Sequence, residues 1–211
     1  MADILLSGFT PFDGRAHNAS WIAARQLAQQ PSNAQRLQCL EIPVCWGEAA
    51  RLLTAAVARS RPRCIIAMGE GAVGRFTIET LAHNARQPRP DNQQCLPEHP
   101  LIDPAGPASF SSSAPVAQIR AALQAQGIAV ELSAKAGGFL CEEALYTLER
   151  LKAQHTDIAL VLFVHLPPFG SPVVYRGVSR TCDEALLADF GAALLHSTLF
   201  CLNGTEADSA S

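Results

Sequence analysis

The chain has 211 residues, of which 48% are hydrophobic and 17% are charged, and its formal net charge is −3. This length and composition suffice for one domain with a substantial core. The basic residues are scattered, which excludes the clustered positive footprint of a nucleic-acid-binding protein. We expect no signal peptide in the opening MADILLSGF, and no uncharged apolar run reaches the roughly 18 residues that cross a membrane.

The first half of the chain alternates apolar runs with helical patterns. Strands are predicted at residues 4–6, 37–44, 64–68 and 76–82, because each is a short run rich in apolar residues. Helices are predicted at residues 21–29, with Asn18 or Ser20 as the N-cap, and at residues 47–59. Residues 86–115 are rich in proline, asparagine, aspartate and serine, so we expect a long loop that is either functional or mobile.

The second half continues the same alternation. A helix at 116–126, a strand at 129–132, a helix after Cys141, a strand before His165 and a last helix at 182–199 complete the predicted order. We expect residues 1–200 to form a single domain and residues 201–211 a disordered tail. The alternation predicts an α/β fold with three layers (α/β/α), in which a mostly parallel, twisted sheet lies between helices.

Seven cysteines are spread along the chain without any CxxC spacing. No group of cysteines and histidines has the spacing of metal ligands, so we expect no bound metal. This pattern is typical of reduced thiols, and it predicts a cytoplasmic protein without a disulfide framework.

Cys141 and His165 stand at the ends of predicted elements. Cys141 follows the small-residue run AGGFL and opens the helical run CEEALYTLERLK, whereas His165 ends the apolar run at 158–164. A helix N-terminus and a nearby imidazolium both favour the thiolate, which is the nucleophilic form of cysteine. Because ligands bind beyond the carboxyl ends of parallel strands, residues 8–12, 69–70, His165 and the turn before Cys141 should meet at one edge.

A thiol and an imidazole need a third group that orients the ring. Glu79 is an isolated carboxylate in an apolar stretch, and we favour it for this role. Each residue also has an ordinary interpretation: Cys141 as a packed thiol, His165 as a hydrogen-bonded core residue, and Glu79 as the solvated face of an edge strand. Residue type and spacing alone leave both interpretations open.

Several segments, in chain order, resemble motifs of the pyroglutamyl peptidase type I (pyrrolidone-carboxylate peptidase) family. They are GFTPFDG at 8–14, HNASW at 17–21, ETLAHN at 79–84, RPDN at 89–92, GPASFS at 106–111, AGGFLC at 136–141 and VHLP at 164–167. The resemblance spans about residues 3–195. It implies an α/β/α fold and a cytosolic cysteine peptidase that removes N-terminal pyroglutamate from peptides through a thioester acyl-enzyme, without a metal or cofactor.

Carried over by position, the resemblance makes Cys141 the nucleophile, His165 the base and Glu79 the acid that orients the base. It also implies small peptide substrates and a homo-oligomer, either a dimer or a tetramer. Neither the composition nor the resemblance points to a nucleic-acid or membrane partner.

The resemblance also implies residues that bind the substrate. Phe9 and Phe12 match the aromatic pair that encloses the flat, neutral pyrrolidone ring, and Arg89 matches an arginine near the oxyanion. Glu70 stands in the pocket-lining segment where the family often has glutamine. A carboxylate cannot donate a hydrogen bond to a lactam carbonyl unless it is protonated, so an altered specificity is a hypothesis here.

Glu142 replaces the asparagine that usually follows the nucleophile in this family, and Glu143 comes next. Acids in a first turn suit the helix dipole, but close to a thiolate they would disfavour its charged form. The alternative is that both side chains point to solvent. Two further hypotheses therefore stay open: a cysteine hydrolase of another cyclic or N-acylated amide, and a binding protein of this type with impaired catalysis.

Overall fold

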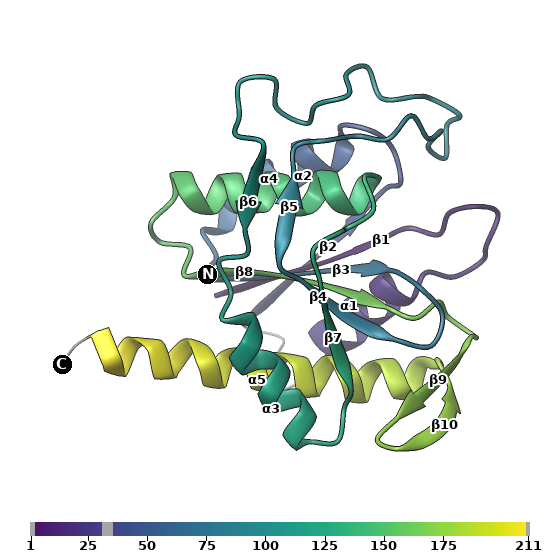
Figure 1. Ribbon diagram of the computed structural model, residues 1–211, viewed down its shortest axis with the longest axis vertical. Helices are drawn as coiled ribbons and strands as arrows, with labels where there is room; N and C mark the ends of the chain where they lie inside the picture. The colour runs from purple at the N-terminus through teal and green to yellow at the C-terminus, as the bar shows by residue number, and fades with distance from the viewer. Residues whose placement is uncertain (1–2, 31–35, 210–211) are drawn as a thin grey trace.

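The computed structural model describes residues 3–30 and 36–209, with residues 203–209 described by their backbone alone. Within these residues, six strands form one sheet in the order β2-β1-β3-β8-β4-β7 (Figure 1). Its strands are β1 (Ile4–Phe9), β2 (Leu37–Ile42), β3 (Cys64–Glu70), β4 (Phe76–Glu79), β7 (Val130–Ser133) and β8 (Leu160–Leu166). Neighbouring strands pair in parallel except β4 and β8, which are antiparallel.

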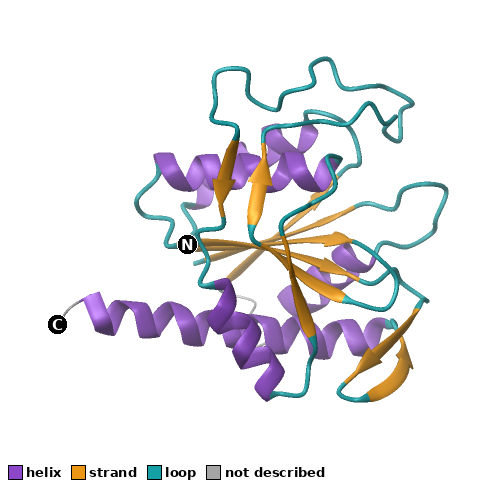
Figure 2. Cartoon of the chain, viewed as in Figure 1, coloured by secondary structure: helices purple, strands orange, loops and turns teal. Residues whose placement is uncertain are grey.

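Helices cover both faces of this sheet (Figure 2). One face carries α1 (Ala19–Gln29), α3 (Val116–Ala125) and α5 (Glu184–Ser209), and the other carries α2 (Glu48–Ser60) and α4 (Leu140–Gln154). Alternation along β1 explains the two cores: Ile4 and Leu6 pack with the first group of helices, and Leu5 and Phe9 with the second. The predicted three-layer α/β/α fold with a mostly parallel sheet is confirmed.

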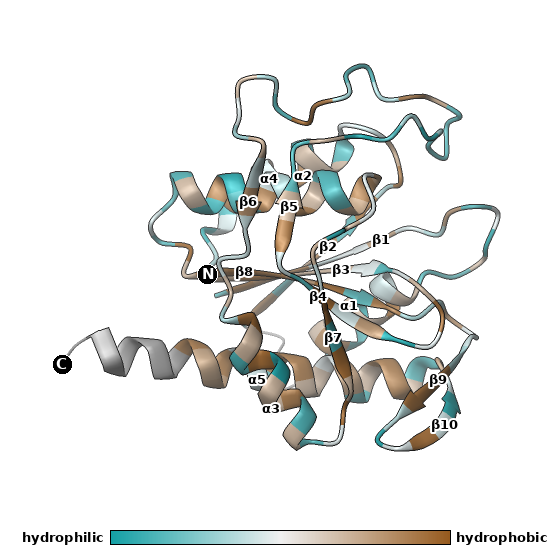
Figure 3. Cartoon of the chain, in the orientation of Figure 1, coloured by the Kyte–Doolittle hydropathy of each residue, from teal (hydrophilic) through white to brown (hydrophobic). Residues whose placement is uncertain are grey.

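The last helix, α5, is the most apolar helix of the fold (Figure 3). From Glu184 to Leu202 it is long and apolar enough to cross a membrane by length and composition alone, yet 61% of that span is buried within the protein. Leu186, Leu187 and Phe190 are fully buried in the same core as α1 and the sheet. Packing against the sheet therefore accounts for the apolar character of α5.

The helix α5 also runs further than the sequence suggested. It ends at Ser209, so residues 201–209, within the segment expected to be a disordered tail, continue the helix. Residues 200–209 contain no proline and one glycine, so nothing in the local sequence stops the helix. Residues 210–211 lie outside the described residues.

The strand predicted at 76–82 is divided into two strands. β5 (Leu81–His83) leaves the main sheet and pairs with β6 (Ser109–Ser111), which lies in the segment predicted as one long loop. Thr80 makes the division, because its N–H donates to the carbonyl of Ser133 (2.6 Å) and its carbonyl accepts from the N–H of Ser112 (2.9 Å). The chain thus passes from the sheet to a second layer over α4.

A hairpin of β9 (Pro172–Tyr175) and β10 (Val178–Thr181) was not predicted. Its turn residues, Arg176 and Gly177, both have positive φ, at 51° and 77°. This is the backbone that a two-residue hairpin turn requires, and a glycine between two runs rich in β-branched residues was the available signal.

Glu149, in the middle of α4, predicts a pH dependence of stability. Burial raises the pKa of this carboxyl from 4.5 to about 7, although its Oε1 accepts from the N–H of Ser113 (2.9 Å). The folded protein therefore holds this proton more tightly than the unfolded chain, so the free energy of unfolding falls as pH rises through that interval. The effect is at most about 3 kcal/mol.

The substitution Glu149→Gln keeps an acceptor oxygen for Ser113 and removes the titration. We expect the stability of the wild type, relative to this variant, to decrease between about pH 5 and pH 8. Urea denaturation across that range measures the difference, with Glu98→Gln on an exposed loop as the control. A difference that does not change with pH contradicts the assignment.

Candidate active site

His165 lies near the end of β8, in the middle of the sheet. The strand register places Gly69 of β3 on one side of it and Thr77 of β4 on the other. Since side chains alternate along a strand, the ring points to the same face as Phe163, which packs in the core beneath α4. Cys141 is the second residue of α4, so the N-terminus of that helix stands over the ring.

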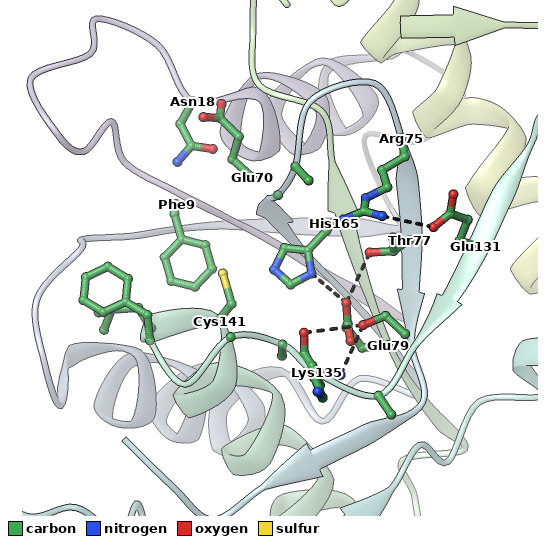
Figure 4. A pocket seen from close by; sticks show the side chains of 18 of the residues that line it. Phe9, Asn18, Glu70, Arg75, Thr77, Glu79, Glu131, Lys135, Cys141 and His165 are labelled. Atoms are coloured by element: carbon green, nitrogen blue, oxygen red, sulfur yellow. Dashed lines mark hydrogen bonds and ion pairs between the residues drawn. The ribbon is translucent and has the colours of Figure 1, made fainter. Parts of the chain in front are cut away.

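The thiol and the imidazole meet above Gly69 (Figure 4). A Cβ atom on Gly69 would stand 2.7 Å from Sγ of Cys141 and 3.2 Å from Nε2 of His165, so only glycine leaves room for both groups. In this position the thiol favours the charged form of the ring. On the other side of the ring, Nδ1 lies 2.8 Å from Oε1 of Glu79. The thiol, the ring and the carboxylate thus lie side by side in that order, with a hydrogen bond between the ring and Glu79.

Burial alone would lower the pKa of His165, because the charged ring loses its water. The charges of Cys141 and Glu79 and their hydrogen bonds outweigh this effect and raise the pKa to about 10. Burial raises the pKa of Glu79, but hydrogen bonds from His165, Ser133 and Thr77 outweigh it and hold the pKa below its usual value. The arrangement therefore favours an imidazolium beside the carboxylate of Glu79 at neutral pH.

Glu79 approaches the ring from the neighbouring strand. Because β4 runs antiparallel to β8 with Thr77 opposite His165, Glu79 lies two residues further along the same face. Glu79 is 1% exposed, and β4 lies between β8 and β7, so it is not an edge strand. The interpretation of Glu79 as a solvated residue of an edge strand is therefore wrong.

A cavity of about 540 Å³ opens beside the thiol. Its lining includes all seven residues that the sequence singled out, which are Phe9, Phe12, Glu70, Glu79, Arg89, Cys141 and His165. A third phenylalanine, Phe139, also lines it and was missed. Its place in the run AGGFLC, two residues before the thiol, was the signal. The indole of Trp46 packs edge-on against this ring, with centroids 5.1 Å apart.

Arg89 stands on the aromatic side of the cavity. Its guanidinium lies 4.4 Å from the ring centroid of Phe139 and 5.8 Å from that of Phe12. One of its nitrogens lies 2.8 Å from a carboxylate oxygen of Asp13. Stacking and the ion pair together connect the loop after β1 to the loop after β5 across the phenylalanines.

Glu70 has both carboxylate oxygens engaged by the protein. One forms an ion pair with Arg15, and the other accepts from the N–H groups of Ala19 (2.9 Å) and Phe169 (3.3 Å). The side chain is 1% exposed. It holds together the loop after β1, the start of α1 and the segment after β8, which form one wall of the cavity.

Glu142 and Glu143 are both buried, so the interpretation that they point to solvent is wrong. Glu142 accepts from the N–H of His83 (2.6 Å), and burial raises its pKa. Glu143 forms an ion pair with Arg86 and accepts from the N–H of Gly47 (3.0 Å). The two carboxylates fix the N-terminus of α4 to the end of β5 and to the start of α2.

Comparison with known proteins shows that most of the chain is similar to pyroglutamyl peptidases. The family model described as pyroglutamyl peptidase matches residues 2–188. The chain is 37% identical over 171 residues to the pyrrolidone-carboxylate peptidase of Klebsiella pneumoniae, covering 79% of this chain and 78% of that protein. For the pyrrolidone-carboxylate peptidase of Streptomyces coelicolor, the identity is 32% over 198 residues, with 92% and 91% covered.

A solved structure shares the fold. The pyroglutamyl peptidase I of Bacillus amyloliquefaciens superposes with a TM-score of 0.80 at 25% sequence identity. The superposition covers 96% of each chain. The likeness thus extends over the sheet and both helical layers.

Gly69 gives a direct test of the geometry. In Gly69→Ala the new methyl would stand 2.7 Å from the sulfur, so the thiol or the ring must move and the interaction between them weakens. We expect iodoacetamide to alkylate Cys141 about tenfold more slowly in this variant than in the wild type. Peptide mass spectrometry follows the alkylation. Gly191→Ala is the control, since its nearest neighbours would lie 3.8 Å away. Equal alkylation rates in Gly69→Ala and the wild type contradict the arrangement.

Proposed function

The chain belongs to the pyroglutamyl peptidase family, and on this premise we propose that it is a cysteine peptidase that removes N-terminal pyroglutamate from peptides. The observation that carries the proposal is the placement of Cys141 next to the hydrogen-bonded pair of His165 and Glu79, beside a cavity with aromatic walls. A nucleophile, a base and an orienting acid next to an apolar pocket suit the cleavage of an amide whose acyl part is a flat, neutral ring.

The reaction has two steps. Sγ of Cys141 attacks the carbonyl carbon that joins pyroglutamate to the next residue, so that the S–C bond forms, the C–N bond breaks, and the leaving amine takes the proton of His165. Water then attacks the thioester and gives its proton to His165, which releases pyroglutamic acid and restores the thiolate and the imidazolium. Glu79 stabilises the charged ring and fixes its orientation in both steps.

The oxyanion that forms during each attack needs hydrogen-bond donors. We assign this role to the N–H groups in the first turn of α4, because Cys141 lies in that turn and such groups lack partners within the helix. The positive end of the helix dipole adds to the effect. Arg89 lines the same cavity and would contribute positive charge.

The pyrrolidone ring is assigned to the space lined by Phe9, Phe12 and Phe139. Aromatic faces can bury a flat lactam at little cost, and a few polar groups then read its amide. Glu70 is proposed to shape this pocket instead of contacting the lactam, because the protein already occupies both of its oxygens. The acidic residue therefore gives no specific support to a different substrate.

The cytoplasm is the proposed location. All seven cysteines are free thiols, and a reducing compartment preserves both them and a reactive Cys141. The homo-oligomer expected from the resemblance stays a prediction.

Release of coumarin from a pyroglutamyl-aminomethylcoumarin substrate tests the function. We expect the wild type to be active and iodoacetamide to abolish the activity. Cys141→Ala and His165→Ala should lower kcat/KM by about 10³-fold or more, and Glu79→Gln by about 10²-fold or more, because each removes a part of one unit. Cys95→Ala, an exposed thiol outside the cavity, is the control and should retain full activity.

The outcome also separates the alternatives. If clean wild-type protein turns over no pyroglutamyl peptide, the proposal is wrong. Turnover of N-acetylated or other cyclic amides in the same assay would then indicate a hydrolase with a different substrate. Binding of pyroglutamyl peptides without any turnover would indicate a binding protein with impaired catalysis.

A further inference from the structure

The cavity has two halves that differ in chemistry, and the order of the strands separates them. Phe9 belongs to β1, two strands to one side of His165 in β8, whereas Glu131 belongs to β7, two strands to the other side. Figure 4 shows Cys141 and His165 between Phe9 and the pair formed by Arg75 and Glu131. The reacting groups thus lie between an aromatic half and a charged half.

The charged half carries an excess of one positive charge. Arg75 and Glu131 form a loose pair, with 3.5 Å between Nη1 and Oε2 and more than half of each side chain exposed. Lys135, in the turn between β7 and α4, is exposed and makes no ion pair with any residue that the structure describes. Glu79, the other carboxylate on this side, already faces the ring of His165.

The position of this half relative to the thiol defines what it would contact. If the pyrrolidone ring fills the aromatic half, as in the proposed function on which this inference rests, the scissile carbonyl lies at Cys141. The chain beyond the scissile bond must then leave along the opposite half, past Arg75 and Lys135. In a pyroglutamyl dipeptide, the free carboxylate would lie in this same place.

We propose that Arg75 and Lys135 bind the residue that follows pyroglutamate, and that they favour an acidic side chain or a free carboxylate there over a basic side chain. Both cations are long, exposed and adjacent to the cleft, so the interaction is a screened ion pair of moderate strength. Glu131 limits the preference because it competes for Arg75.

The test compares kcat/KM for three peptides of equal length with aspartate, alanine or lysine after pyroglutamate and an amidated C-terminus. For the wild type at low salt, we expect the aspartate peptide to exceed the lysine peptide by about three- to tenfold. The ratio should fall towards one in about 0.5 M salt, because screening weakens exposed pairs.

Substitutions assign the preference to residues. Lys135→Gln and Arg75→Gln should each lower the ratio of aspartate to lysine turnover, and Glu131→Gln should raise it. Arg59→Gln, an exposed cation on α2 that does not line the cavity, is the matched control and should leave the ratio unchanged.

A wild-type ratio near one, or a ratio that none of the three substitutions changes, would overturn this proposal while leaving the proposed function intact. Absence of turnover of all three peptides and of the uncharged coumarin substrate would instead refute the proposed function itself.

Discussion

The charge on a buried imidazole is the constraint on which the rest of the site depends. A ring as buried as that of His165 would ordinarily be neutral, because burial disfavours the charged form. Here Glu79 lies on one ring nitrogen and the thiol of Cys141 lies beside the ring, and both favour the proton. Two features of the neighbouring strands serve to keep this ring charged. Gly69 leaves room for the sulfur, and the reversed strand β4 brings the carboxylate alongside.

The helix that carries the thiol is held by buried acids. Glu142, directly after Cys141, accepts from the N–H of His83 in β5, and Glu143 accepts from the N–H of Gly47 before α2 and forms an ion pair with Arg86. Burying a carboxylate is unfavourable unless it has partners. Here the N–H groups of His83 and Gly47 and the guanidinium of Arg86 supply them, and these contacts orient α4. The same carboxylates that seemed able to disfavour a thiolate therefore position it. Glu70 acts in the same manner at the opposite wall.

Local patterns in the sequence were enough to predict much of the fold and the positions of the reacting residues. Apolar runs and helical periodicity were sufficient for the main sheet, the helical layers, and the placement of Cys141 and His165 at element ends. Periodicity does not report strand direction, so the route by which Glu79 reaches the ring could not be derived from it. The burial of Glu142 could not be predicted either, because its partner at His83 is remote in the chain.

The most direct measurement is the protonation of His165, followed by NMR of a labelled imidazole between about pH 6 and pH 11. The account predicts that the ring stays an imidazolium through neutral pH and titrates at about 10. Glu79→Gln should shift this titration to lower pH, because a neutral amide stabilises the charged ring less than a carboxylate does. A wild-type titration at the ordinary value of 6.5, unaffected by Glu79→Gln, would contradict the central claim.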